Sequence, residues 1–217
     1  MTKHSFVCIL VILIASMSLS SCITIINKVK VNADKSGTAF IGVEINMFSK
    51  LKTLSSDNIS AKEKNTIISF PEIAKQKLSG LKGISNIKTY GIVNFGRFGV
   101  EFDFKNSKAL NKAYYKLMDE DYRWFYPSLI KVKSSMIKVK NLSPYIKSYI
   151  EDNEDDLLSP NIIKYVDVAT IIELPRQIKY ARIGKGAISH NEKIFTNITP
   201  LKSIMNEEVS IGFRLKY

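Results

Sequence analysis

Apolar and polar residues alternate in two segments directly after residue 22. The first segment places Ile23, Ile25, Val29 and Val31 on one face of a strand, and the second does the same for Ala39, Ile41, Val43, Ile45 and Met47. A period of two predicts strands with one buried face, and the residues 34–37 between them are turn formers. We therefore predict a β-hairpin that begins at once, with no linker before it.

The remaining elements predict a single mixed domain. Helices are expected from Phe48 into the 70s with a break near Pro71, from an N-cap at Ser107, and at 143–151 and 201–205. Strands are expected over 84–94, 98–105, 128–139, 165–174 and 209–215, with a hairpin over 178–195 that turns near His190. Because no βαβ rhythm is present, we predict one α+β domain over residues 22–217. It has an antiparallel sheet with helices packed mainly on one face.

Residues 1–21 have the layout of a secretory signal peptide. Lys3 and His4 precede an apolar stretch, Phe6–Leu19, and small residues follow it. The stretch would reach only about 21 Å as a helix, short of the roughly 30 Å hydrocarbon core of a bilayer. A cleaved signal is thus favoured over a permanent transmembrane anchor.

Leu19, Ser20, Ser21 and Cys22 resemble the lipobox of bacterial lipoproteins. The resemblance implies a diacylglycerol on the thiol of Cys22, cleavage before it, and acylation of the new amine by a fatty acid such as palmitate. A buried thiol after ordinary signal cleavage is the alternative for Cys22. The chain is accordingly expected in the bacterial cell envelope, and Ile23, in place of an aspartate, favours the outer membrane over the inner membrane.

The hairpin that follows also resembles a known group. The order of lipobox cysteine, short strand, residues 31–37 and second strand, with a later Leu174–Pro175, is similar to envelope lipoproteins of the mycobacterial LppM-like family. That resemblance implies a sheet-and-helix domain, for which a hydrophobic or lipid-ligand pocket has been suggested. No functional residue of the family transfers to this chain.

Composition and charge narrow the choice of partners. The 217 residues include 32 Lys or Arg and 20 Asp or Glu, a net charge of +12, and 45% are hydrophobic. Such a chain folds, and it lacks the repeated apolar runs of a polytopic membrane protein. Export excludes nucleic acid as a partner. Lysines alternate at 131, 133, 138 and 140, which predicts several ammonium groups on one strand face, either solvated or against anionic head groups.

Candidate chemistry is sparse. After processing, the chain holds one histidine, His190, and no thiol other than Cys22, so we predict no catalytic residue, no metal site and no cofactor. The acidic stretch 151–156 is interpreted as a solvated loop, with a weak cation site as the alternative. An enzyme, a hydrolase that uses paired carboxylates, is the least favoured hypothesis.

Two functional hypotheses remain. The first is a non-enzymatic binding or interaction module, held on the bilayer by acylated Cys22, whose partner is an envelope protein. The second is a carrier or sensor of a hydrophobic, lipid-like ligand between sheet and helices, in a candidate pocket lined by Phe102, Phe104, Leu110 and Tyr114. The aromatic cluster over residues 114–126 is predicted either to pack in the core or to lie at a lipid interface.

Overall fold

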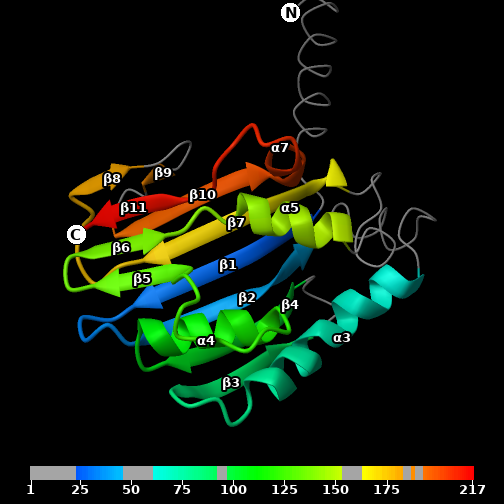
Figure 1. Ribbon diagram of the computed structural model, residues 1–217, viewed down its shortest axis with the longest axis horizontal. Helices are drawn as coiled ribbons and strands as arrows, with labels where there is room; N and C mark the ends of the chain where they lie inside the picture. The colour runs from blue at the N-terminus through cyan, green and yellow to red at the C-terminus, as the bar shows by residue number, and fades with distance from the viewer. Residues whose placement is uncertain (1–22, 46–60, 92–96, 153–162, 183–186, 189–192) are drawn as a thin grey trace, which may run out of the picture.

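The computed structural model describes residues 23–45, 61–91, 97–152, 163–182, 187–188 and 193–217, which form two β-sheets with helices beside them (Figure 1). The large sheet has seven strands in the order β3 (Ile84–Tyr90), β4 (Arg97–Phe104), β2 (Gly37–Ile45), β1 (Ile23–Val31), β7 (Val166–Glu173), β10 (Ile194–Pro200) and β9 (Ala187–Ile188). The small sheet has four, in the order β5 (Ile130–Lys133), β6 (Met136–Val139), β11 (Phe213–Lys216) and β8 (Tyr180–Arg182). The helices are α3 (Ala61–Leu78), α4 (Ser107–Leu117), α5 (Ser143–Asp152) and α7 (Leu201–Met205).

The predicted N-terminal hairpin is present. β1 and β2 pair antiparallel from Ile23 opposite Ile45 to Val31 opposite Gly37. The carboxylate of Asp34 accepts hydrogen bonds from the backbone N–H and the hydroxyl of Ser36, which closes the turn between them. Short polar side chains that bond their own backbone favour such turns.

The helices and the small sheet cover the same face of the large sheet (Figure 1). One apolar cluster joins the large sheet to α3, α4 and the small sheet, and it contains Val29, Leu78, Leu110 and Ile137. A second cluster joins the Ile23 end of the sheet to α5 and α7. The predicted α+β class, with helices on one face of a mostly antiparallel sheet, is therefore confirmed. One strand pair, β1 with β7, is parallel.

Two helix predictions were wrong in detail. Pro71 does not break its helix, because α3 continues through it to Leu78. The N-cap of α4 is Asn106, not Ser107: the Asn106 side chain accepts a hydrogen bond from the N–H of Ala109. Asn106 has the extended backbone of a capping residue, whereas the hydroxyl of Ser107 donates to the carbonyl of Ile130. The part of the first predicted helix before residue 61 lies outside the described residues.

The C-terminal third also differs from the prediction. The predicted hairpin over 178–195 is present only in its second half: β9 pairs antiparallel with β10 on either side of the predicted turn near His190, whereas β8 pairs with β11 in the small sheet. The last strand covers only Phe213–Lys216, and Ile211 is buried outside it. The predicted strand over 128–139 is in fact two strands, β5 and β6, joined at residues 134–135. The place of β8 depends on pairing with β11, a distant segment, which local alternation does not specify, whereas β5 and β6 form a local hairpin.

Candidate interaction surface

The outer face of the small sheet is lined by cations from all four strands. Strand pairing places Lys131 opposite Lys138, Lys138 opposite Arg214, and Arg214 opposite Arg182. These four side chains form a straight row across the sheet. Lys133 and Lys216 stand in the next row, with Met136 between them and Tyr180 at its end. We call the six Lys and Arg residues the cationic face.

The reason for this arrangement is the alternation within each strand. The opposite face of the small sheet carries the apolar partners Ile130, Val132, Ile137, Val139, Phe213 and Leu215, all at most 8% exposed. They pack into the cluster that the large sheet shares with α3 and α4. Because side chains alternate between faces, burial of the apolar set turns every Lys and Arg of these strands outward.

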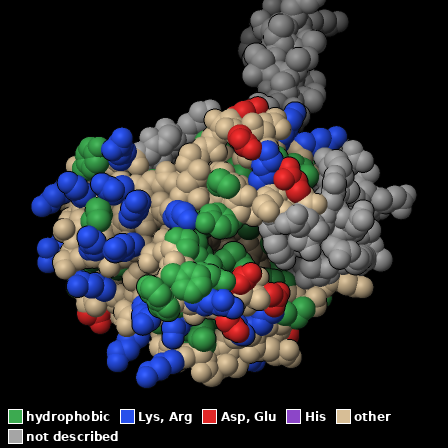
Figure 2. All heavy atoms as spheres, in the orientation of Figure 1, with side chains coloured by type: hydrophobic (Ala, Val, Ile, Leu, Met, Phe, Trp, Pro, Cys, Tyr) green, Lys and Arg blue, Asp and Glu red, His purple; other side chains and the backbone are tan. Residues whose placement is uncertain are grey.

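The cationic face holds no neutralising carboxylate. β5, β6, β8 and β11 contain no Asp or Glu. Within the described parts of the chain, no carboxylate oxygen lies within 4.0 Å of any of the six cations. Like charges directly opposite on neighbouring strands repel each other. In Figure 2 the Lys and Arg side chains gather over the four strands of the small sheet.

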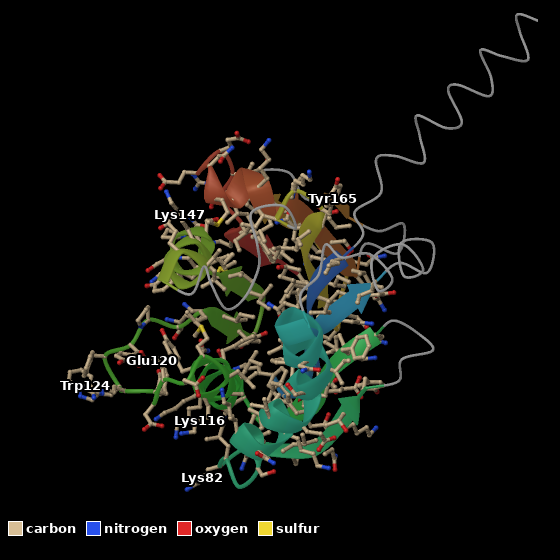
Figure 3. All side chains as sticks on the ribbon, turned by 90° about the vertical axis from the view of Figure 1, so that its right-hand side faces the viewer. Lys82, Lys116, Glu120, Trp124, Lys147 and Tyr165 are labelled. Atoms are coloured by element: carbon tan, nitrogen blue, oxygen red, sulfur yellow. The ribbon has the colours of Figure 1, made fainter. Side chains whose placement is uncertain are left out.

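Beside this face, the loop between α4 and β5 presents aromatic rings to solvent. Trp124 is 90% exposed and Phe125 is 59% exposed. Figure 3 shows Trp124 projecting away from the rest of the molecule. We call Trp124 and Phe125 the aromatic tip. Figure 2 shows hydrophobic side chains grouped next to the cationic region.

A ladder of ring contacts joins the aromatic tip to the core. The ring of Trp124 meets that of Phe125 edge-on at 5.7 Å between centroids, and Phe125 meets Tyr126 at 5.2 Å. Tyr126 packs at 5.0 Å against Tyr115, which is only 6% exposed, and Tyr122 packs against the same ring. Edge-on and tilted geometries are the favoured ones for aromatic pairs. Successive ring contacts therefore connect the aromatic tip to a buried residue of the core.

Both ends of the loop are fixed by hydrogen bonds. The buried side chain of Asn111 on α4 accepts from the backbone N–H groups of Leu129 and Ile130, at 2.5 and 3.2 Å, and donates to the carbonyl of Ile130 at 2.6 Å. The hydroxyl of Tyr115 donates to the carbonyl of Pro127 at 2.9 Å. The end of α4 and the start of β5 are thereby held together, and the loop projects from them.

Acidic residues in the same loop are already paired. Asp119 accepts from Lys77 at 2.7 Å, and Asp121 accepts from Lys116 at 2.9 Å. The bond from Lys116 holds the pKa of the Asp121 carboxyl below its usual range. Glu120 accepts from the hydroxyl of Tyr126 at 3.3 Å. These carboxylates thus have partners within the loop region and leave the cationic face unneutralised.

The four residues of the predicted ligand pocket come together in the core. Phe102 and Leu110 are fully buried and Phe104 is 2% exposed, all in the main apolar cluster, with Tyr114 packed against it. The hydroxyl of Tyr114 donates to the side-chain oxygen of Asn27 on β1 at 2.6 Å, and burial raises the pKa of Tyr114 above its ordinary value. A ligand between sheet and helices would have to displace these packed side chains, so the carrier hypothesis stays a prediction.

A shallow recess at the turn end of β2 is a weaker candidate for a site. It encloses about 450 Å³ and is open to solvent, with polar residues around it. Its one carboxylate, Asp103, is already engaged, because one oxygen accepts from Thr38 at 2.8 Å and the other from Asn86 at 2.7 Å. No group of three or more His, Cys, Asp or Glu that could hold a metal occurs among the described residues. Nor is any helix in the described ranges long and apolar enough to cross a membrane.

Several predicted site residues lie outside the described residues. These are Cys22, the lipobox residues Leu19, Ser20 and Ser21, His190, and most of the acidic stretch 151–156. The alternating lysines of β5 and β6 were recognised in the sequence as one face. Arg182 and Arg214, which complete the cation row, were not, because their place depends on the pairing of β8 and β11.

Comparison with protein-family models and with curated protein sequences returned no match. Among solved structures, the chain is similar to the NMR structure of the folded domain of the LppM protein from Mycobacterium tuberculosis. The sequence identity is 8%, the alignment covers 91% of each chain, and the TM-score is 0.43. That neighbour is a lipoprotein domain of the group that the N-terminal hairpin resembles. The proposals below depend on this chain's own residues.

Proposed function

We propose that this chain is a lipid-anchored protein of the bacterial cell envelope that acts as a non-enzymatic interaction module. Cys22 holds the chain on the bilayer, the outer membrane in preference to the inner, and the cationic face with the aromatic tip binds the partner. The main support for this proposal is the row formed by Lys131, Lys138, Arg214 and Arg182. Its four directly opposed cations repel one another in the free protein, and an anionic partner would turn that repulsion into attraction.

The composition of the surface also supports binding over chemistry. Trp, Tyr and Arg are the residues that contribute most to binding interfaces, and they are present here on the aromatic loop and on the outer face of the small sheet. General acid–base or metal chemistry near neutral pH most often uses histidine, and the mature chain would have only His190. We therefore expect His190→Ala to complement a deletion strain as well as the wild type does. Loss of complementation by a folded, membrane-bound variant would revive an enzymatic function.

The anchor is tested by labelling. Cells fed a clickable fatty acid should label the wild type and leave Cys22→Ala unlabelled, because the only other thiol, Cys8, lies inside the apolar stretch of the signal peptide and not in a lipobox. Label retained by the variant would overturn the lipobox assignment.

The binding surface is tested by photo-crosslinking in cells. A photoreactive amino acid replaces Met136, which stands between the two lysines of the second row, and in a matched variant it replaces Ile198, 54% exposed on the uncovered face of the large sheet. We expect a crosslinked product, with a protein or with a lipid, from position 136 and much less from position 198. Equal products from both positions, or none from position 136, would contradict the assignment of the surface.

A further inference from the structure

The cationic face has the geometry of a surface that meets another surface. Its side chains come from four neighbouring strands about 4.8 Å apart and stand on one face of the sheet, so they are spread over that face and do not converge on one point. The face therefore does not resemble a site for a single small anion, in which several donors surround one ligand. An array of separate anionic groups in a plane matches it better.

The aromatic tip adds a second kind of contact at the edge of that array. The loop that carries Trp124 leads directly into β5, the edge strand of the small sheet. Trp rings favour the interfacial region of a bilayer, where an apolar ring and a polar N–H are both accommodated. Basic residues beside exposed aromatic residues are the combination used by proteins that bind at a membrane surface.

We propose that the partner of the cationic face is an anionic phospholipid bilayer, against which the small sheet lies with Trp124 at the level of the head groups. This inference rests on the proposed function and names its partner. A protein partner with an acidic surface is the alternative outcome of the test. The bilayer is favoured because Trp124, at 90% exposure, stands on a projecting loop, so that its ring can enter the head-group region.

The lipid anchor by itself does not impose this contact. Cys22 precedes Ile23, which lies in the second apolar cluster with α5 and α7. The small sheet packs instead on the first cluster, with Val31 at the other end of β1. The nine residues of β1 separate these ends by roughly 30 Å. A membrane contact at Trp124 would thus be evidence that the cationic face binds the bilayer, and could not be explained by the acyl chains on Cys22 alone.

Trp124 is the only tryptophan of the chain, so its fluorescence reports the contact directly. Lipidated full-length protein is reconstituted in phosphatidylcholine vesicles, with or without phosphatidylglycerol, that carry brominated acyl chains as quenchers. We expect blue-shifted and quenched emission on the anionic vesicles only, and a return to the emission of exposed tryptophan as salt is raised.

Charge variants identify the basic residues that are needed for docking on anionic vesicles. Each basic residue near an anionic surface contributes about fivefold to partition, so the double variant Lys138→Glu and Arg214→Glu should lower the docked fraction more than about tenfold. The matched control reverses Lys75 and Lys82, which are exposed on other elements, and should keep the quenching. Lys131→Gln with Lys138→Gln, which removes charge without reversing it, should show a smaller loss.

Two results would overturn the inference: equal emission on neutral and anionic vesicles, or equal loss in the control and in the surface variant. The crosslinking experiment separates this failure from that of the proposed function. A protein adduct at position 136 together with a solvent-exposed Trp124 on anionic vesicles means that the surface binds a protein and not a bilayer. No adduct and no change of emission overturns both proposals.

Discussion

Among the described residues, no helix or second sheet covers the other face of either sheet, and these two uncovered faces are built in opposite ways. On the uncovered face of the large sheet, basic and acidic residues meet: Lys30 contacts Glu173 at 2.9 Å, and Lys88 contacts Glu101 at 3.9 Å. The charged residues on the outer face of the small sheet are all cations, and four of them stand directly opposite one another. The charges of the large sheet are therefore paired within the protein. Those of the small sheet repel one another, and under the proposal above an anionic partner neutralises them.

The uncovered face of the large sheet also has a small apolar cluster of its own. Phe40 lies over the paired glycines Gly42 and Gly99, where an added Cβ would approach its ring to 2.8 and 2.7 Å. The guanidinium of Arg97 covers the ring at 4.0 Å from its centroid, and Tyr90 packs edge-on beside it. An aromatic ring over strand glycines restores the packing that glycine lacks. On the cationic face the ammonium of Lys216 lies 6.0 Å from the ring centroid of Tyr180, and the described residues there form no buried apolar cluster.

We expect the largest change in stability when substitutions on the buried and the outer side of the small sheet are compared. Phe213 is 4% exposed, with its ring 4.5 Å from that of Phe195, so Phe213→Ala should lower the free energy of unfolding by about 4 kcal/mol. Arg214→Ala, on the cationic face one residue later, should change it by less than about 0.5 kcal/mol. Urea unfolding of both variants measures the difference. Similar losses would mean that the small sheet does not pack as described.

A somewhat smaller loss of stability is expected from a substitution on the uncovered face of the large sheet, and almost none from the matched substitution on the cationic face. Phe40→Ala should lower the free energy of unfolding by about 3 kcal/mol, because the ring is 2% exposed although nothing but side chains of its own sheet covers it. The matched substitution on the cationic face, Met136→Ala, should cost less than about 0.5 kcal/mol. Thermal unfolding compares the pair, and equal shifts in melting temperature would remove the distinction.

The same charge reversal should have opposite signs on the two faces. Lys138→Glu places a carboxylate between Lys131 and Arg214, and it should raise the free energy of unfolding by about 0.5 to 1 kcal/mol. Lys30→Glu removes an ion pair and sets two carboxylates together, so it should lower stability. Both are read from the urea midpoint. If Lys138→Glu destabilises the protein, the cations do not repel one another and the main support for an anionic partner is lost.

The smallest expected effect is the loss of the stability contributed by the Lys30–Glu173 ion pair at alkaline pH. The hydrogen bond and the charge of Glu173 raise the pKa of Lys30 above its ordinary value of 10.5. The folded state therefore holds this proton more tightly, and the stabilisation is complete below pH 10.5 and disappears as pH rises through the folded-state pKa. The stability difference between the wild type and Lys30→Gln should be present at neutral pH and vanish at high pH. The control Lys28→Gln should show no such change, and a constant difference for Lys30→Gln would contradict the pair.

Part of the cationic face could be predicted from the sequence, because the alternation that orients its lysines acts between neighbouring residues. Alternation within residues 130–133 and within 136–139 places the lysines of each segment on the side opposite to its apolar residues. Lys131 and Lys138 have opposite parity along one continuous strand, so they share a face only because the turn at residues 134–135 folds β6 back onto β5. The aromatic cluster was likewise visible in the sequence, although whether it packs in the core or at an interface was left open. The structure divides it: Tyr115 is buried and Trp124 is exposed.

The class of the fold and the N-terminal hairpin thus follow from local sequence patterns, as does the separation of lysines from apolar residues within β5 and within β6, because a period of two acts within a few residues of the chain. Arg182 and Arg214 extend the lysines into a row only through pairing of segments far apart in sequence. Long-range packing likewise places Asn111 against the aromatic loop and pairs β1 parallel with β7. These features depend on which buried faces pack together, and that choice is made by the whole core and not by any local pattern.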